Sequence, residues 1–183
     1  MIATLTKLPS RRIFSILSSL IIVFTLNSCG DYRSEETCGD SIAEGDKGRF
    51  EVDKDGFAKD TESDVVWYRC SAGQQYSNFR CKGEILYLSW DEAIDYAAEF
   101  SEKSGITWRL PTDNEMQSVT EDACVAPAIN HNAFPSIAVE NHWTSSKGLH
   151  QDIFRCAVNT YSGRLSCRQP RDVGQPFMLV RED

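Results

Sequence analysis

The segment Ser89-Trp-Asp-Glu-Ala-Ile-Asp-Tyr-Ala-Ala-Glu-Phe100 contains the clearest secondary-structure signal of the chain. Ser89 and Glu92 have the spacing of a capping box, in which each side chain accepts a hydrogen bond from the backbone amide of the other residue. Apolar residues then recur at helical spacing, and Gly105 is of the residue type that often ends a helix. The pattern predicts an amphipathic helix that begins after Ser89 and stops at Gly105.

A short strand and a second helix follow. Thr107-Trp-Arg-Leu110 is predicted to be a strand that ends before Pro111, which cannot donate a backbone hydrogen bond. Thr112 and Glu115 repeat the capping-box spacing. A second, shorter helix is therefore expected to run to about Val119.

Strands are predicted on both sides of the two helices. Arg49–Val52 and Asp64–Tyr68 flank the turn-favouring residues 53–56, which indicates a strand, a turn and a returning strand. Alternation on either side of Ser162-Gly163 predicts a hairpin, and the apolar run Pro176–Val180 predicts a buried closing strand.

Residues 121–141 contain two prolines and no clear period, so we expect a long loop there. Strands, two helices, a long loop and more strands, in that order, are typical of an α+β domain. A chain of 183 residues, 41% of them hydrophobic, is long enough for one packed domain. We place this domain at residues 49–183.

The N-terminus has the pattern of an export signal. Residues 1–12 carry three basic residues and no acid, and Ile13–Leu26 is uncharged and mostly apolar. This run is shorter than the ~20 residues that a membrane-spanning helix needs. A basic segment before a short apolar core predicts a secretory signal peptide.

Leu26-Asn27-Ser28-Cys29 resembles the bacterial lipobox, which implies cleavage of a signal peptide, residues 1–28, and acylation of Cys29. Two or three acyl chains would anchor the chain stably in a membrane. Gly30 stands where retained inner-membrane lipoproteins often carry Asp, so the cell envelope, and there the outer membrane, is the expected location. The alternatives are a plain signal peptide or an uncleaved signal anchor, with Cys29 incidental.

Residues 29–48 are expected to form the lipidated N-terminus and a flexible tether, because residues 30–48 are rich in Gly, Asp, Glu and Ser and have no hydrophobic period. The formal net charge of the whole chain is -8, and removal of the signal would take away only basic residues. No cluster of Lys and Arg suited to a phosphate backbone is present, so nucleic acid is not an expected partner.

Removing Cys29 leaves six of the seven cysteines, and an even number in an oxidising compartment predicts complete pairing. Six cysteines allow fifteen connectivities. Cys156 and Cys167 flank the predicted hairpin nearly opposite each other, and Cys70 and Cys81 bracket a polar loop. The pair Cys38–Cys124 remains by elimination.

A structural zinc site is the alternative use of these cysteines. Neither a C-x₂-C spacing nor an H-x₃₋₅-H spacing is present, so no metal is expected.

A set of short motifs, in order and naturally spaced over residues 49–182, resembles the Lcl C-terminal domain family. The motifs are Arg49-Phe50, Asp55-Gly56, Asp60, Val66-Trp67, Trp90-Asp91-Glu92-Ala93, Trp108-Arg109-Leu110-Pro111-Thr112, Glu115, Pro127-Ala128-Ile129-Asn130, Phe134-Pro135, Trp143-Thr144-Ser145-Ser146 and Val180-Arg181.

The resemblance implies a C-type-lectin-like fold, with two helices packed on a small, mostly antiparallel sheet and a long loop, here stapled by disulfides. The family is associated with bacterial surface proteins, and its founding member with adhesion to sulfated polysaccharide. This chain departs from that picture in its acidity, which disfavours polyanions. It also lacks the sugar-binding triplets of calcium-dependent lectins, since the nearest, Gln169-Pro170-Arg171, places an arginine where calcium needs a ligand.

Several candidate sites are weighed against ordinary structural roles. Glu51, Asp53, Asp55 and Glu62 have part of the spacing of an EF-hand, but their predicted flanks are strands, so a polar hairpin turn is favoured. A catalytic role for three histidines and a sugar-stacking role for four tryptophans are both less favoured than packing. These residues are His131, His142, His150, Trp67, Trp90, Trp108 and Trp143.

The loop 121–141 and the adjoining strand from His142 to Ser146 are the expected place for a ligand, by analogy with loops on other rigid scaffolds. The favoured function is a non-catalytic binding or adhesion module of the envelope, without a cofactor, acting on an unidentified glycan or protein. A structural or assembly subunit is the first alternative. The second is a redox enzyme like the formylglycine-generating enzymes, with Cys156 and Cys167 as the active pair.

Overall fold

The computed structural model describes residues 35–182, so the predicted signal peptide and Cys29 lie outside the described residues. The structure assigns Ser34–Asp183 to one compact unit. The helices are α1 (Cys38–Ser41), α2 (Trp90–Ser104) and α3 (Asp113–Ser118). The strands are β1 (Phe50–Val52), β2 (Phe57–Asp60), β3 (Val66–Tyr68), β4 (Gln75–Ser77), β5 (Arg80–Lys82), β6 (Trp108–Arg109), β7 (Asn141–Lys147), β8 (Phe154–Asn159), β9 (Arg164–Pro170) and β10 (Val180–Arg181).

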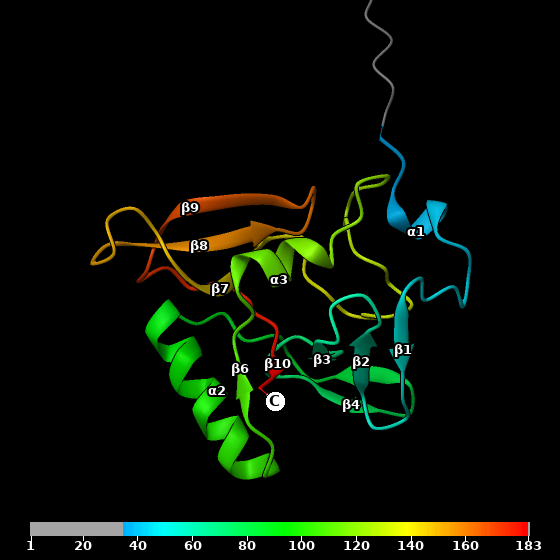
Figure 1. Cartoon of the computed structure of the whole chain (residues 1–183), viewed down its shortest axis with the longest axis horizontal. Helices are drawn as coiled ribbons and strands as arrows, with labels where there is room; N and C mark the ends of the chain where they lie inside the picture. The colour runs from blue at the N-terminus through cyan, green and yellow to red at the C-terminus, as the bar shows by residue number, and fades with distance from the viewer. Residues whose placement is uncertain (1–34, 183) are drawn as a thin grey trace, which may run out of the picture. The chain divides into compact units, whose positions relative to one another are not determined.

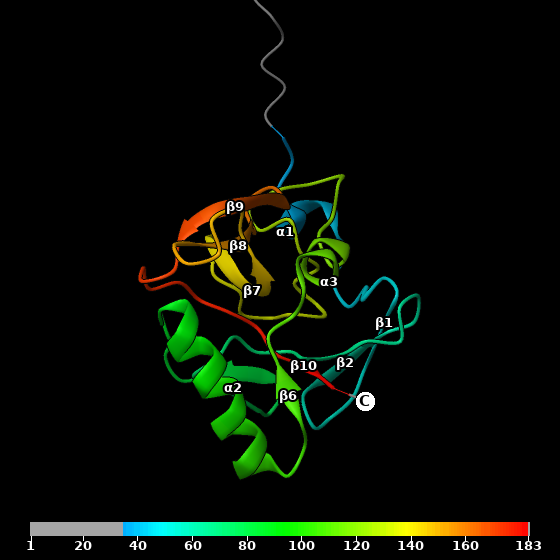
Figure 2. The same cartoon turned by 60° about the vertical axis from the view of Figure 1, so that its left-hand side comes forward.

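These strands form three separate antiparallel sheets (Figures 1 and 2). The largest has the order β1-β2-β3-β10-β6, the second is β7-β8-β9, and β4 and β5 form a hairpin. In both views α2 lies beside β6, and α3 lies between β6 and the three-stranded sheet. The α+β class expected from the sequence is confirmed. None of the helices in the described part of the chain is both long and apolar enough to cross a bilayer.

Both predicted helices begin at the capping boxes that the sequence indicates. Ser89 accepts a hydrogen bond from the Glu92 amide, and the Glu92 carboxylate accepts one from the Ser89 amide at 2.9 Å. Thr112 and Glu115 form the same reciprocal pair. At its other end α2 stops at Gly105, whose left-handed φ of 69° suits glycine.

The hydrophobic core consists of two adjoining clusters. In the first, Phe50 and Trp67 pack edge-on against Phe134 with ring centroids 5.1 and 6.0 Å apart. In the second, Trp108 and Trp143 pack with residues from α2 and from the segment before β10. The long loop and the two sheets therefore share one interior.

Two strand predictions need correction. The turn at 53–56 leads into β2, not directly into residues 64–68, and a second turn then leads to β3. Phe57–Asp60 was missed because it is short and half polar, although Ala58 and Asp60 are both buried. The predicted closing strand 176–180 is buried throughout, but only its last residue belongs to β10.

The predicted tether is also too long. Residues 35–48 pack onto the domain, because Cys38 is joined to Cys124 and its amide donates to the Val125 carbonyl at 2.9 Å. The Asn132 side chain then binds the carbonyls of Ala43 and Asp46 at 3.0 and 2.9 Å. A polar segment without a hydrophobic period is thus fixed by a disulfide and by hydrogen bonds, neither of which leaves a periodic signal.

Candidate binding surface

Three disulfides join the six cysteines of the described chain in the pairs that spacing and elimination indicated. The Cα atoms are 4.9 Å apart in Cys38–Cys124, 5.5 Å in Cys70–Cys81 and 3.8 Å in Cys156–Cys167. Asp113, Cys156 and Cys167 are the one grouping of three potential metal ligands among the described residues. Because both sulfurs are bonded to each other, this grouping offers no thiolate to a metal.

The long loop 121–141, where we expected a ligand, contributes to the hydrophobic core. Ala128, Ile129 and Ala133 are fully buried. Arg69, itself 6% exposed, donates to the carbonyls of Asn132 and Ala133 at 2.8 and 2.7 Å. The loop is therefore held in place by a buried guanidinium, and its exposed residues include Asp122, Pro135 and Val139.

The adjoining strand is also inaccessible at its start. His142, Trp143 and Thr144 are fully buried. The Trp143 indole donates to the Leu88 carbonyl at 2.8 Å, and the Thr144 hydroxyl donates to the Cys156 carbonyl at 2.9 Å. Burial lowers the pKa of His142 to about 4, against a hydrogen bond to the Glu140 carbonyl that raises the pKa. These side chains support the fold and do not face a ligand.

The remaining candidates also have structural roles. One Asp53 carboxylate oxygen accepts from the amides of Asp55 and Phe57 at 2.9 and 2.8 Å, so this motif is a hairpin turn. Glu62 lies 3.4 Å from Arg49. Among the described residues no histidine takes part in a grouping of three metal-ligand side chains.

The tryptophans do not form a stacking platform. Three of them, Trp67, Trp108 and Trp143, are buried in the core, which confirms the preference for packing. Trp90 is half-buried, donates to the Thr144 carbonyl at 2.7 Å, and has the Arg155 guanidinium 4.2 Å above its ring.

A different surface combines a depression with exposed apolar side chains. We call it the three-loop surface: residues 87–92 at the start of α2, residues 148–153 between β7 and β8, and residues 171–174 after β9. These segments line an open pocket of about 550 Å³ with Ser89, Asp91, Glu92, Asp152, Ile153, Arg171 and Asp172.

Arg171 joins the three segments. Its side chain donates to the Asp91 carboxylate through Nε at 2.9 Å and also through Nη2. Its backbone amide donates to the Ile153 carbonyl at 2.9 Å, and its carbonyl accepts from the Trp90 amide at 2.8 Å. One residue from the third segment thus fixes the other two, which gives the pocket a defined shape.

The charge of this pocket is negative. The hydrogen bond to Asp91 raises the pKa of Arg171, and the charges of Asp152 and Asp172 act in the same direction. Hydrogen bonds from Ser89 lower the pKa of Glu92, which therefore stays ionised. After Asp91 is paired with Arg171, three carboxylates remain without a compensating cation in the pocket lining.

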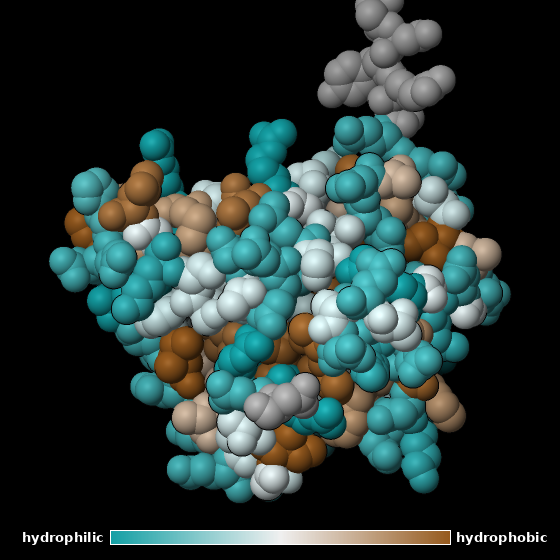
Figure 3. All heavy atoms as spheres, in the orientation of Figure 1, coloured by the Kyte–Doolittle hydropathy of each residue, from teal (hydrophilic) through white to brown (hydrophobic). Residues whose placement is uncertain are grey.

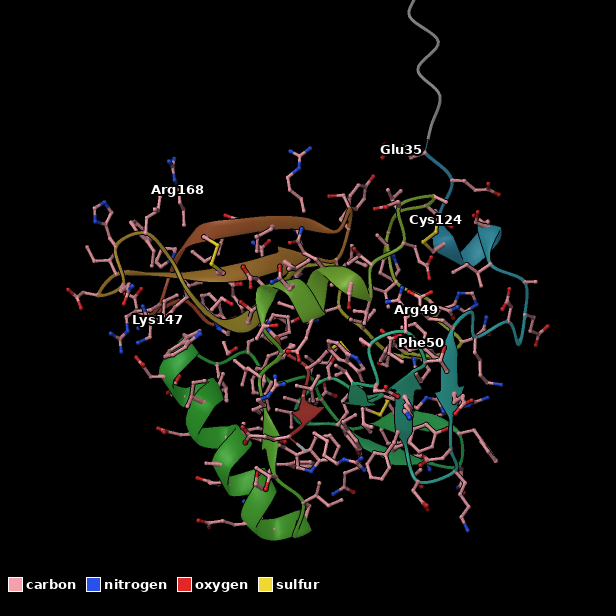
Figure 4. All side chains as sticks on the ribbon, viewed as in Figure 1. Glu35, Arg49, Phe50, Cys124, Lys147 and Arg168 are labelled. Atoms are coloured by element: carbon pink, nitrogen blue, oxygen red, sulfur yellow. A yellow bond between two sulfur atoms is a disulfide. The ribbon has the colours of Figure 1, made fainter. Side chains whose placement is uncertain are left out.

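Exposed apolar side chains occur in the same segments. Ile153, 56% exposed, lines the pocket itself, while Leu149 (79%) and Val173 (45%) lie in the segments 148–153 and 171–174 that contribute to it. Figure 3 shows apolar side chains gathered at the left end of the view, over the β7–β8 loop, and Figure 4 places Lys147 at that end while Arg168 points away from β9. Exposed aliphatic side chains around a charged, preformed pocket are the usual composition of a recognition surface.

The sequence contains a signal for this surface. Leu149 and Ile153 are isolated apolar residues within the polar segment 148–153, and Val173 stands alone in a second polar loop.

A second depression, about 390 Å³ in volume, lies between α2 and β6 and is lined mainly by apolar atoms, as the central part of Figure 3 shows.

Comparison with known proteins identifies the family. The sequence model of the Lcl C-terminal domain matches residues 56–181, well over half of the chain. The chain therefore belongs to the Lcl C-terminal domain family, as its motifs indicated. Neither the curated proteins nor the solved structures contain a match.

Proposed function

For this member of the Lcl C-terminal domain family, we propose the function of a lipid-anchored, non-catalytic binding module of the bacterial envelope. The three-loop surface is its ligand site. The observation that carries the proposal is a negatively charged pocket that Arg171 holds in shape, lined by the exposed Ile153 and formed by segments that also carry the exposed Leu149 and Val173. The ligand that fits best combines positive charge with an apolar part.

The protonation state of the pocket favours binding over catalysis. A general acid at neutral pH needs a raised carboxyl pKa. Hydrogen bonds from Ser89 instead lower the pKa of Glu92. Asp91 is held by Arg171, so its lone pairs are committed to the structure of the site.

The redox alternative is disfavoured by the surroundings of Cys156 and Cys167. Cys156 is 2% exposed, and an Asp113 carboxylate oxygen lies within 4.8 Å of both sulfurs. A thiolate beside a carboxylate is electrostatically unfavourable, whereas reactive thiols are found in positive surroundings. We therefore assign this disulfide a structural role.

The anchor rests on Cys29, which follows the apolar segment Ile13–Leu26 and precedes the folded unit by few residues. Cys29→Ser should move the chain from the membrane fraction to the aqueous fraction. The mass of the mature N-terminus checks the same point, since diacylglyceryl-cysteine is heavier than cysteine. An unmodified N-terminal cysteine, or cleavage elsewhere, would refute the anchor.

The ligand site is tested with three single substitutions in the full-length chain, extracted in mild detergent and immobilised. Ile153→Ser and Val173→Ser change the three-loop surface. Tyr161→Ser is the matched control, because Tyr161 is 47% exposed on the β8–β9 turn, at the other end of β8. The probes are a glycan array and the detergent-solubilised envelope proteins of the producing bacterium.

We expect a glycan or a protein that the wild-type chain and Tyr161→Ser retain and that both surface variants lose at least tenfold. Equal retention by all four chains would remove the three-loop surface from consideration.

A further inference from the structure

The β4–β5 hairpin carries an exposed aromatic side chain at its tip. Ser77 pairs with Arg80, so Asn78 and Phe79 form a two-residue turn. Both have positive φ angles, 52° and 63°. Phe79 is 77% exposed.

Phenylalanine is an unfavourable residue at this position. Two-residue hairpin turns with both central φ angles positive strongly prefer Asn-Gly, because glycine has no Cβ to clash in the left-handed region. Asn78 follows the rule and Phe79 does not. A strained backbone that presents a solvent-exposed ring points to a role outside the fold.

The hairpin is rigidly mounted. Cys81 is bonded to Cys70 at the end of β3. The Tyr76 amide donates to the Tyr68 hydroxyl at 2.9 Å, and the Tyr76 hydroxyl accepts from the Arg69 guanidinium at 2.5 Å. A side chain presented on a fixed hairpin loses little conformational entropy when it binds.

The charge of the hairpin is opposite to that of the rest of the chain. Residues 74–83 contain Arg80 and Lys82 and no acidic residue, while the chain as a whole has a net charge of -8. Both cations are exposed and, in the described residues, neither forms a salt bridge. They lie one and three residues after Phe79 on the same strand face, because side chains alternate along a strand.

We propose that the hairpin tip of one chain docks into the three-loop surface of a second copy. Phe79 would pack among Leu149, Ile153 and Val173, and the cations behind it would face the uncompensated carboxylates Glu92, Asp152 and Asp172. In Figure 1, β4 lies at the lower right and the β7–β8 loop at the left end, so a chain cannot fill its own pocket.

A tip-to-pocket contact is heterologous, and repetition of such a contact produces open chains or rings. A single hairpin tip buries less area than the ~1,000 Å² expected of a stable interface. The contact is therefore weak in dilute solution and becomes populated where chains are concentrated on a membrane. The inference rests on the proposed function only in using the same surface.

Photo-crosslinking tests the proposal in the full chain. Phe79 is replaced by p-benzoylphenylalanine, and cells that produce the chain are irradiated. The matched control carries the same probe at Tyr161, another exposed aromatic residue in a β-turn. We expect an adduct of twice the chain mass from position 79 only, with the attachment point in residues 87–92, 148–153 or 171–174.

Two further variants separate charge from folding. Arg80→Glu with Lys82→Glu should reduce the dimeric adduct at least fivefold, and Asp152→Lys with Asp172→Lys in the same chain should restore it. Phe79→Gly should abolish association while its melting temperature stays equal to that of the wild type or rises by a few degrees, since glycine relieves the turn.

Adducts to lipid or to another protein, an attachment point outside the three-loop surface, or no dimeric adduct would each overturn the proposal. If Ile153→Ser and Val173→Ser lose the envelope ligand while position 79 gives no dimeric adduct, this inference fails and the proposed function stands.

Discussion

The segment 108–115 and the three-loop surface are both rich in charged and apolar residues, but they use them in opposite ways. In residues 108–115, Leu110 is fully buried and Arg109 binds both oxygens of Glu115 at 2.8 Å. On the three-loop surface, Leu149 is 79% exposed and four carboxylates share one cation, Arg171, in the pocket lining. The most distinctive motif of the family thus builds the scaffold and lies outside the proposed ligand surface.

The largest expected difference between the two regions is in the free energy of unfolding. Leu110→Ala should destabilise the protein by about 2–5 kcal/mol, because a cavity would form among Trp108, Trp143 and Phe177. The matched control Leu149→Ala should change stability by less than about 0.5 kcal/mol. Urea unfolding without reductant measures the free energy of unfolding of both variants. Equal losses of stability would contradict the assignment of Leu110 to the scaffold and Leu149 to the surface.

The second prediction concerns the loss of stability at acidic pH that His142 causes. Burial lowers the pKa of His142 to about 4 from 6.5, so the unfolded chain binds this proton first as pH falls. The contribution of neutral, buried His142 to the free energy of unfolding is complete above pH 6.5 and is progressively lost as pH falls toward 4. By about pH 5 the loss amounts to roughly 2 kcal/mol.

His142→Gln provides the control, since it removes the titration and leaves every other titrating group in place. Unfolding curves of wild type and variant at several pH values should show a shallower pH dependence for the variant between pH 6.5 and 4. Parallel curves would mean that His142 has the same pKa in the folded and the unfolded protein. Either result concerns the scaffold, because His142 is fully buried.

The third prediction concerns the ion pair of the signature segment. The hydrogen bond from Arg109, with those from Thr112, lowers the pKa of Glu115 to about 2. The ionised Glu115 carboxylate therefore stabilises the folded protein above pH 4.5, and this stabilisation is lost as pH falls toward 2. At neutral pH, Glu115→Gln should cost about 1–2 kcal/mol, with a discount for partial exposure.

A matched control is Lys103→Gln, which breaks the exposed pair with Glu99 at 3.1 Å. Its cost should stay below about 0.5 kcal/mol. The difference between wild type and Glu115→Gln should shrink at acidic pH, where the wild-type carboxylate is protonated as well. A difference that does not depend on pH would assign the effect to packing.

The helices and two of the disulfide pairs were accessible from sequence because their signals are local, and the pair Cys38–Cys124 then followed by elimination. Ser89 and Glu92 are three residues apart, and Cys156 and Cys167 flank one hairpin. The docking of residues 35–48 depends on Asn132, almost ninety residues away, and the pattern predicted only a tether. Long-range polar contacts leave no period in the sequence.

The proposed three-loop surface was not accessible from sequence for the same reason. Analogy pointed to the loop 121–141, and the sequence could not show that Arg69 holds this loop inside the fold. The three-loop surface depends on contacts of Arg171 with distant segments, such as that with Asp91 across 80 residues of sequence. Only the isolated apolar residues in polar loops, such as Ile153, could have indicated it.

The smallest expected change in stability comes from Arg171→Lys, and this substitution separates the two regions most sharply. Both side chains of the Arg171–Asp91 pair are partly exposed, at 37% and 49%, and exposed pairs contribute little to folding. Lysine keeps the charge but cannot donate two hydrogen bonds to Asp91 and reach the Asp152 carbonyl as arginine does.

We therefore expect a change of less than about 1 kcal/mol in the free energy of unfolding, together with weaker retention of the envelope ligand, because the three segments lose their common partner. Arg168→Lys, on the exposed face of β9, should change neither quantity. A loss of stability without a loss of binding would make Arg171 part of the scaffold, like Arg109. Unchanged binding with unchanged stability would show that the loops keep their arrangement through backbone hydrogen bonds alone, such as that from the Arg171 amide to Ile153.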